Sequence, residues 1–209
     1  MSIYLQTGKR VLDVSGALIG LAAGAAPMAL IAALIRLTMG TPVLHRVTRP
    51  GLRGEPFVLN KFRTMTTVRN PSGELLPDRD RITRLGRILR RTSLDELPQL
   101  LNVVCGHMSL VGPRPLKMEY LALYSERQAR RHDVRPGITG LAQISGRNLL
   151  DWDARFELDV FYAANVSWRL DLMILLKTAV VVLYRQTVSD DGDLDVPSFT
   201  GPSSTSQSY

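Results

Sequence analysis

Two adjacent carboxylates, Asp95 and Glu96, follow a strongly basic stretch and precede an apolar run in the segment RRTSLDELPQLLNV. One interpretation is structural: Ser93 and Glu96 fit the S-x-x-E capping box, and acidic residues stabilise the first turn of a helix. The other is chemical. Adjacent helical residues point about 100° apart, so one carboxylate can face a substrate while its neighbour holds a metal ion. On this stretch alone, the cap is the favoured interpretation.

The chemical interpretation requires cations, because a carboxylate that attacks a phosphate meets like-charge repulsion. The sequence offers arginines in constrained or glycine-rich segments, where guanidinium and backbone N–H groups can approach phosphate. They are Arg90, Arg114 in LVGPRP, Arg135 in RPGITG and Arg147 in GRN. Each one alone is more simply a surface residue of a basic chain, but the joint pattern indicates a phosphate site.

The composition supports an anionic partner. Four of the 19 acidic residues, and none of the 26 Lys and Arg, lie after Ser189, so residues 1–189 carry 26 basic and 15 acidic groups. Such a body suits a membrane surface or phosphorylated substrates. We expect no nucleic acid, because aromatic residues are few and not interleaved with basic ones. Cys105 is the only cysteine, which excludes an intrachain disulfide and a cysteine-based zinc site.

An uncharged apolar segment of 22 residues covers positions 14–35, close to the roughly 20 residues that cross a bilayer core. Basic residues flank the segment on both sides. Lys and Arg are enriched on the cytoplasmic flank of a membrane helix, so both ends of this segment have the character of a cytoplasmic flank. Pro27, in the middle, deletes a backbone hydrogen bond and kinks a helix. The residues alone leave two options open: a straight spanning helix, or a kinked one that enters and leaves by the same face.

The rest of the chain predicts a helix-rich α+β fold with a short sheet. Period-two alternation predicts a strand over residues 54–65, with Lys61 and Arg63 on one face. Apolar spacing predicts amphipathic helices that suit a membrane surface or a small core. The expected helices cover residues 81–91, 150–166 and 168–185. We divide the chain into a membrane helix (1–39), a cytosolic domain at the membrane surface (40–187) and a disordered tail (188–209).

Four blocks, in order, carry a family resemblance: KFRTM, TSLDELPQLLNV, MSLVGPRP and RPGITGLAQISGR. Together with the N-terminal apolar segment, they resemble the bacterial sugar transferases, the small monotopic polyprenyl-phosphate phosphoglycosyl transferases. The match runs from about Lys9 to about Arg185. The resemblance implies transfer of a sugar 1-phosphate from a UDP-sugar to polyprenyl phosphate, usually undecaprenyl phosphate, with release of UMP. It also implies that the enzyme needs Mg²⁺ and lies at the cytoplasmic face of the bacterial inner membrane. The reaction would be the first membrane step of glycoconjugate synthesis.

The resemblance also implies roles for individual residues. Asp95 corresponds to the nucleophile, and Glu96 to its metal-linked neighbour, so we assign both to catalysis and to the metal. The family's re-entrant helix breaks at a proline that corresponds to Pro27. Many members carry a serine directly before this proline, where this chain has Ala26. The phosphate-binding positions fall on Lys61, Arg90, Arg114 and Arg147.

Two alternatives remain at this point. The lipid phosphate can attack the UDP-sugar directly, with Asp95 only a metal ligand. The chain can also be a non-enzymatic protein that binds anionic lipid, with the acidic pair as a helix cap. The sequence is also compatible with a homodimer.

Overall fold

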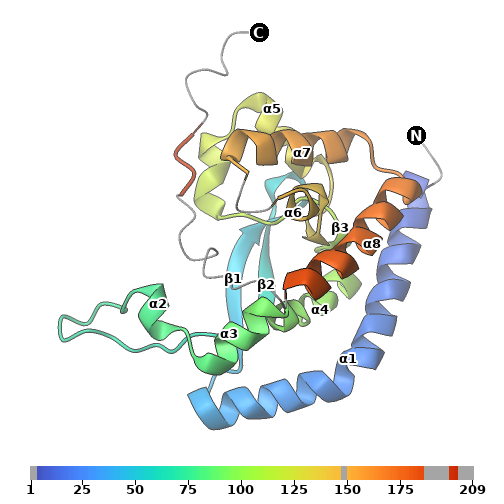
Figure 1. Cartoon of the computed structure of the whole chain (residues 1–209). Coiled ribbons are helices and arrows are strands. Elements are labelled where there is room, and N and C mark those ends of the chain that lie inside the picture. Colours follow the sequence, from blue (N-terminus) through green and yellow to red (C-terminus); the bar gives the residue numbers. More distant parts are fainter. Residues whose placement is uncertain (1–3, 147–149, 186–197, 202–209) are drawn as a thin grey trace.

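The computed structural model describes residues 4–146, 150–185 and 198–201, and it has the expected helix-rich class with short sheets. Figure 1 shows a long N-terminal helix beside and beneath a body of shorter elements. In chain order the elements are η1 (Tyr4–Gly8), α1 (Lys9–Met39), β1 (Leu44–Pro50), η2 (Leu52–Gly54), β2 (Pro56–Phe62), α2 (Asp78–Arg81), α3 (Arg84–Arg91), η3 (Leu94–Glu96), α4 (Gln99–Val104), β3 (Ser109–Val111), η4 (Met118–Leu123), α5 (Glu126–Ala129), η5 (Arg130–Asp133), β4 (Gly137–Thr139), α6 (Leu141–Ile144), α7 (Trp152–Ala164) and α8 (Trp168–Arg185).

Helix α1 is long and apolar enough to cross a membrane, and only 11% of its most apolar window is buried inside the protein. Pro27 lies within it. Figure 1 shows a sharp bend partway along the helix. A proline inside a helix removes one backbone hydrogen bond and clashes with the preceding turn, which is the usual cause of such a bend.

The two arms of α1 pack against the same body. In the first arm, Ala17 is fully buried in a cluster that includes Leu100 of α4. In the second arm, Ile35 is fully buried in a cluster with Phe62 of β2 and Leu89 of α3. The helix therefore leaves the body and returns to it, and the two arms are held by separate apolar clusters.

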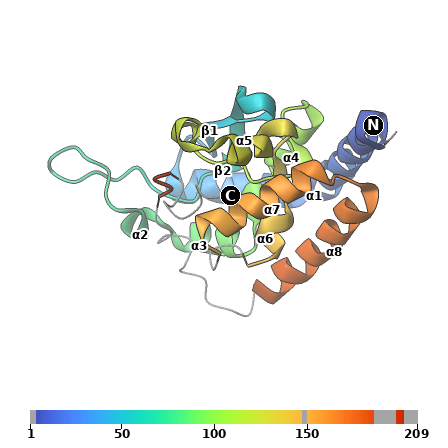
Figure 2. The same ribbon diagram turned by 90° about the horizontal axis from the view of Figure 1, so that it is seen from above.

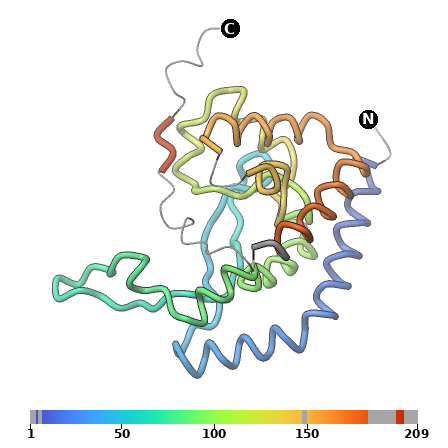
Figure 3. The backbone as a smooth tube through the Cα atoms, in the orientation of Figure 1, coloured from blue at the N-terminus to red at the C-terminus, as the bar shows by residue number. Residues whose placement is uncertain are grey.

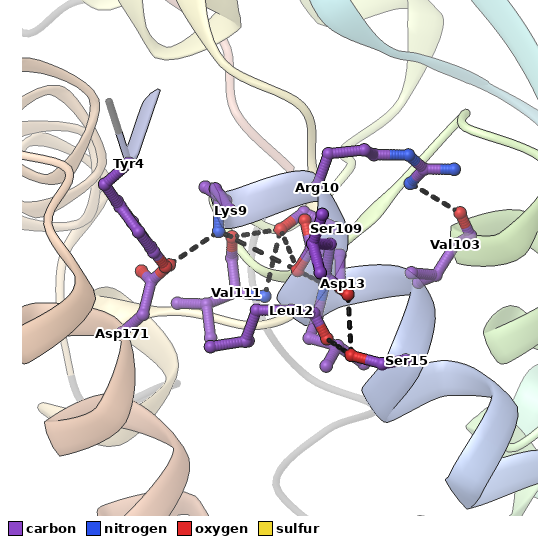
Figure 4. Close-up of polar contacts among 12 residues, drawn as sticks. Tyr4, Lys9, Arg10, Leu12, Asp13, Ser15, Val103, Ser109, Val111 and Asp171 are labelled. Atoms are coloured by element: carbon purple, nitrogen blue, oxygen red, sulfur yellow. Dashed lines mark hydrogen bonds and ion pairs between the residues drawn. The ribbon is translucent and has the colours of Figure 1, made fainter. Parts of the chain in front are cut away.

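The start of α1 is fixed to the body by a largely buried group of polar residues, of which Figure 4 labels Tyr4, Lys9, Asp13, Ser109 and Asp171. Lys9 Nζ lies 2.7 Å from Asp171 Oδ2, and Tyr162 Oη donates to Asp171 Oδ1 at 2.7 Å. Asp13 Oδ1 accepts hydrogen bonds from Ser109 Oγ and from the Leu110 backbone N–H, each at 2.9 Å. We call the group the helix-foot network; its members are Tyr4, Lys9, Asp13, Ser109, Tyr162 and Asp171.

Two small sheets support the loops of the body. Strands β1 and β2 form an antiparallel pair with Leu44 opposite Phe62, and β2 confirms the expected strand over its central residues. Strands β3 and β4 are parallel, with Ser109 opposite Gly137. A Cβ at Gly112 would lie 2.3 Å from the carbonyl oxygen of Arg135. Glycine therefore lets the LVGPRP and RPGITG segments touch through their backbones.

The predicted helices form near their expected bounds. In α7, Phe156 and Val160 are buried, which confirms the apolar stripe. In α3, Leu89 is buried but Ile88 is 58% exposed, so only part of the predicted stripe faces the core. In α8, Asp171 interrupts the apolar sequence because it belongs to the helix-foot network. Figure 2 shows α8 extending along one side of the body, next to α7.

The expectation of a disordered tail needs a correction at residues 198–201. Phe199 in this segment is only 3% exposed and packs with Tyr120, Trp152 and Phe156. Low hydrophobicity and many small polar residues predict disorder for the tail as a whole, but one aromatic side chain can bind a pocket on the body. Residues 186–197 and 202–209 lie outside the described part of the chain.

Candidate active site

A cavity of about 800 Å³ lies within the body, in the size range of small-molecule sites. Its lining comes from segments far apart in the sequence, including β2, the residues around η3 and helix α7. Five predicted site residues line it, namely Lys61, Arg90, Asp95, Glu96 and Arg114. Arg147 lies outside the described residues. Arg135 does not line the cavity; its Nε donates to the carbonyl oxygen of Gly106 at 2.9 Å.

The acidic pair is not a helix cap. Asp95 and Glu96 lie in the short 3₁₀ helix η3, and Ser93 before it has a left-handed backbone, with φ of 58°. The Ser93 side chain makes no capping hydrogen bond. The backbone N–H of Ser93 donates to the Arg90 carbonyl oxygen at 3.2 Å. The capping-box interpretation is therefore wrong, because the Glu96 side chain points to Lys61 instead of returning to Ser93.

Glu96 is held by two cations. Its Oε1 accepts a hydrogen bond from Lys61 Nζ at 2.6 Å and lies 3.1 Å from Arg114 Nη2. Burial by itself raises the pKa of Glu96, but the charges and hydrogen bonds of Lys61 and Arg114 together outweigh burial and lower the pKa to about 2. Glu96 is therefore a permanent anion that fixes two cationic side chains of the cavity.

Asp95 has the opposite environment. It is 8% exposed and makes no hydrogen bond or ion pair with any other residue in the described ranges. Burial raises its pKa to about 6, and the negative charge of Glu96 adds to this effect, while more distant cations oppose it. An unpaired carboxylate in a cavity is available to react, and a raised pKa makes its oxygen a better nucleophile.

Arg90 is brought to the cavity by close packing of α3. A Cβ at Gly86 would lie 1.9 Å from the carbonyl oxygen of Thr64, so only glycine allows this contact. The N-terminus of α3 is capped by Thr83, whose side chain accepts from the Gly86 N–H. One turn later, Arg90 Nε donates to Thr64 Oγ1 at 3.1 Å. The glycine therefore sets how closely the arginine approaches the site.

The cavity wall contains a buried ion pair that no sequence motif indicates. Arg131 is 2% exposed, and its Nη2 lies 2.7 Å from Asp159 Oδ2. The same nitrogen donates to the backbone carbonyl oxygen of Arg114 at 2.7 Å. Asp159 stands beside Phe156 and Val160 on the apolar stripe of α7, and an acidic residue in that position is the signal that predicts a buried partner.

The acidic pair Asp95 and Glu96 is the candidate for holding a metal ion in the cavity. The described residues contain no group of three or more His, Cys, Asp or Glu side chains able to hold a metal ion. Mg²⁺ commonly uses one or two carboxylates together with substrate phosphates and water, so a large all-protein ligand set is not required. Asp95, which has no side-chain partner among the described residues, and the adjacent Glu96 fit that pattern.

The apolar helix α1 and a cavity lined by carboxylates and cations fit the class of membrane-associated enzymes with anionic substrates. A family model described as bacterial sugar transferase matches residues 4–185. The chain belongs to this family, and it is therefore a transferase. The alternative of a non-enzymatic lipid-binding protein is wrong.

Individual relatives agree with this assignment. The chain is 51% identical over 193 residues to the sugar transferase EpsL of Bacillus subtilis (strain 168), covering 92% of this chain and 96% of EpsL. It is 46% identical over 187 residues to the UDP-glucose:undecaprenyl-phosphate glucose-1-phosphate transferase of Caulobacter vibrioides, covering 84% of this chain and 69% of that protein. It is 38% identical over 191 residues to the exopolysaccharide production protein ExoY of Sinorhizobium fredii, covering 83% of this chain and 84% of ExoY.

Proposed function

We propose that this protein transfers a sugar 1-phosphate from a UDP-sugar to undecaprenyl phosphate and releases UMP. The name of the Caulobacter relative states this type of reaction for a UDP-glucose donor. One observation carries the proposal for this chain: Asp95 lies in the cavity with no side-chain partner among the described residues, next to Glu96, which binds both Lys61 and Arg114. This arrangement combines a nucleophile with cations for a diphosphate.

The proposed reaction has two displacements at phosphorus. First, an Asp95 oxygen bonds to the sugar-bearing phosphorus, and the bond from that phosphorus to the bridging oxygen breaks, so UMP leaves with the electron pair. Next, an oxygen of undecaprenyl phosphate bonds to the same phosphorus, and the bond to Asp95 breaks. The second step restores the Asp95 carboxylate. Lys61, Arg90 and Arg114 offset the negative charge of the phosphates in both steps.

Mg²⁺ would be held by Glu96 and Asp95 together with the phosphates of the donor. When bound, it would withdraw charge from the diphosphate and make UMP a better leaving group. The side chain of Glu96 suits this task because its low pKa keeps it ionised throughout the physiological range.

We further propose that α1 enters and leaves the cytoplasmic leaflet of the inner membrane as a re-entrant hairpin broken at Pro27. The support is that Ala17 in one arm and Ile35 in the other pack against the same body, an arrangement that a straight spanning helix does not explain. Ala26 replaces the serine that many members have before the proline, so the bend in this chain lacks that hydroxyl. In this proposed topology the cavity would lie near lipid headgroups, where undecaprenyl phosphate presents its phosphate.

Isotope exchange tests the covalent step. The detergent-purified protein is incubated with a panel of UDP-sugars, Mg²⁺ and labelled UMP, without any lipid acceptor. A covalent intermediate requires label to enter the UDP-sugar, and Asp95→Asn must abolish this exchange. Asp133→Asn is the matched control, since Asp133 is an exposed carboxylate that does not line the cavity.

Direct attack by undecaprenyl phosphate in a ternary complex is the alternative with Asp95 as a metal ligand only. It requires both substrates at once, so it predicts no exchange without the lipid and intersecting double-reciprocal lines. Either result would overturn the covalent mechanism while leaving the overall reaction intact. Failure of every UDP-sugar to yield UMP with the lipid present would overturn the function itself.

A further inference from the structure

Residues 198–201, which we call the C-terminal segment, pack against the body through the side chain of Phe199, which is buried. The ring of Phe199 lies among four aromatic rings, which we call the aromatic cage: Tyr120, Tyr124, Trp152 and Phe156. The Phe199 backbone N–H also donates to Tyr120 Oη at 3.1 Å. Figure 3 shows this short red segment beside the yellow-green part of the chain that precedes α7.

The aromatic cage is also part of the cavity wall. Trp152 and Phe156 line the cavity, whereas Phe199 does not. The Phe199 and Phe156 ring centroids are 4.9 Å apart in an edge-to-face arrangement, and those of Phe199 and Trp152 are 5.7 Å apart. Phe199 therefore contacts two residues of the wall without lining the cavity itself, and its contacts limit how far the two rings can move.

A continuous set of contacts leads from the aromatic cage to the acidic pair. The Arg131 guanidinium lies 5.6 Å from the Phe156 ring centroid and 5.8 Å from that of Tyr124, within cation–π range. Arg131 Nη2 donates to the Arg114 carbonyl oxygen at 2.7 Å. The side chain of Arg114 in turn contacts Glu96 at 3.1 Å.

We propose that Phe199 is a positioning residue for the transferase reaction: it completes the aromatic cage, and the cage fixes the cavity wall and the Arg131–Arg114 contact that aligns the donor's phosphates. The C-terminal segment is thus a functional part of the active site although it does not touch the substrate. This inference rests on the proposed function of the Asp95 site, and it adds a segment that lies after the family match at residues 4–185.

Two truncations and two point variants test the proposal. Removal of residues 198–209 deletes Phe199, and removal of residues 202–209 retains it as the matched control. Phe199→Ala empties the cage in the intact chain, and Phe199→Leu restores most of the apolar volume without a ring. The readouts are KM for the UDP-sugar, kcat, and fluorescence of Trp152 in a Trp168→Phe background, where Trp152 is the only tryptophan.

The expected result is a rise in KM for the UDP-sugar of about tenfold in the longer truncation and in Phe199→Ala, a typical effect of losing support behind a metal-linked or phosphate-binding residue. Phe199→Leu recovers part of the loss, and the 202–209 truncation stays within about twofold of the full chain. The emission of Trp152 shifts to the red in the two variants that empty the cage. A peptide of residues 195–204, added to the longer truncation, restores both KM and emission.

Three outcomes would overturn the inference. Unchanged Trp152 emission would mean that Phe199 does not occupy the cage. A red shift with unchanged KM, accompanied only by a lower apparent kcat, would mean that the segment affects the folded fraction and does not position the site. A full chain that releases no UMP with any donor would refute the proposed function, and the inference with it; an active full chain keeps the two failures separate.

Discussion

The Asp95 site and the helix-foot network both bury carboxylates beside cations, but they treat the charge differently. Asp171 in the helix-foot network is fully buried, and its two oxygens accept hydrogen bonds from Lys9, Tyr4 and Tyr162. Asp95 is 8% exposed and has no such partner in the described part of the chain. An unpaired buried charge is costly, so it persists where it serves a function. The two centres therefore differ in whether the carboxylate has partners, and not in burial, and this difference separates the proposed reactive centre from the structural one.

The largest expected effect in this comparison belongs to Asp95. Asp95→Asn keeps the shape of the side chain but removes the nucleophilic oxygen anion, so UMP release falls at least about 1,000-fold. The protein remains folded, because no hydrogen bond in the described part of the chain is lost with the charge. Steady-state UMP release measures the rate, and circular dichroism on the same preparation measures whether the variant is folded. A variant with a tenth of the normal rate would contradict the role of Asp95 as nucleophile.

Asp171→Asn is expected to show the reverse pattern. It removes the carboxylate that lies 2.7 Å from the half-buried Lys9 ammonium and leaves the weaker contact with Asp13 at 3.9 Å, so the free energy of unfolding falls by about 3 kcal/mol. The kcat of the folded fraction stays within about tenfold of normal, since the helix-foot network does not line the cavity. Denaturant unfolding in detergent gives the first quantity, and active-site-normalised kinetics the second. Loss of all activity without loss of stability would erase the distinction between the two centres.

A substitution of Lys61 tests the role of Glu96 and the cations bound to it. Lys61→Met removes the 2.6 Å contact to Glu96 and one cation that faces the phosphates, so kcat/KM for the UDP-sugar falls about 10- to 100-fold. Lys177→Met is the matched control, because Lys177 is exposed and does not line the cavity. Equal losses in the two variants would indicate a general effect of lowering positive charge, and not a specific contact at Glu96.

The sequence predicted the elements and much of the candidate site, because both depend on local patterns. The strand at β2 and the apolar stripe of α7 follow from side-chain period, and the cavity contains Lys61, Arg90 and Arg114 of the predicted phosphate set. The cap at Ser93 was wrong for a long-range reason: Glu96 binds Lys61, which is 35 residues away. Local patterns contain no information about such a partner.

Two other features also depend on contacts between distant segments. Arg131 has no motif, and its importance is visible only once Asp159, 28 residues later, lies beside it. Phe199 belongs to a segment whose composition predicts disorder, and its burial requires an aromatic cage built from η4, α7 and the residue after η4. Tertiary pairing of this kind can be recognised in a sequence only as an isolated acidic or aromatic residue in an unusual place.

The smallest expected effect is on the pH dependence of the free energy of unfolding, to which Asp95 and His132 contribute with opposite signs. The pKa of Asp95 is raised to about 6, so the folded form binds more protons between its ordinary pKa of 3.8 and pH 6, and stability rises as pH falls. Burial lowers the pKa of His132 to about 4, with the charge of Arg131 adding to the effect. The unfolded form therefore binds more protons between pH 4 and 6.5, and stability falls as pH falls.

Between pH 7 and pH 5, Asp95 thus contributes a gain of about 1 kcal/mol and His132 a loss of about 2 kcal/mol. Asp95→Asn removes the gain, so this variant is more stable than the wild type at pH 7 yet loses stability more steeply on acidification. His132→Gln removes the loss and flattens or reverses the slope. Denaturant unfolding at pH 7, 6 and 5 measures all three slopes. An Asp95→Asn slope equal to that of the wild type would mean that the Asp95 charge is compensated in the folded protein, as that of Asp171 is.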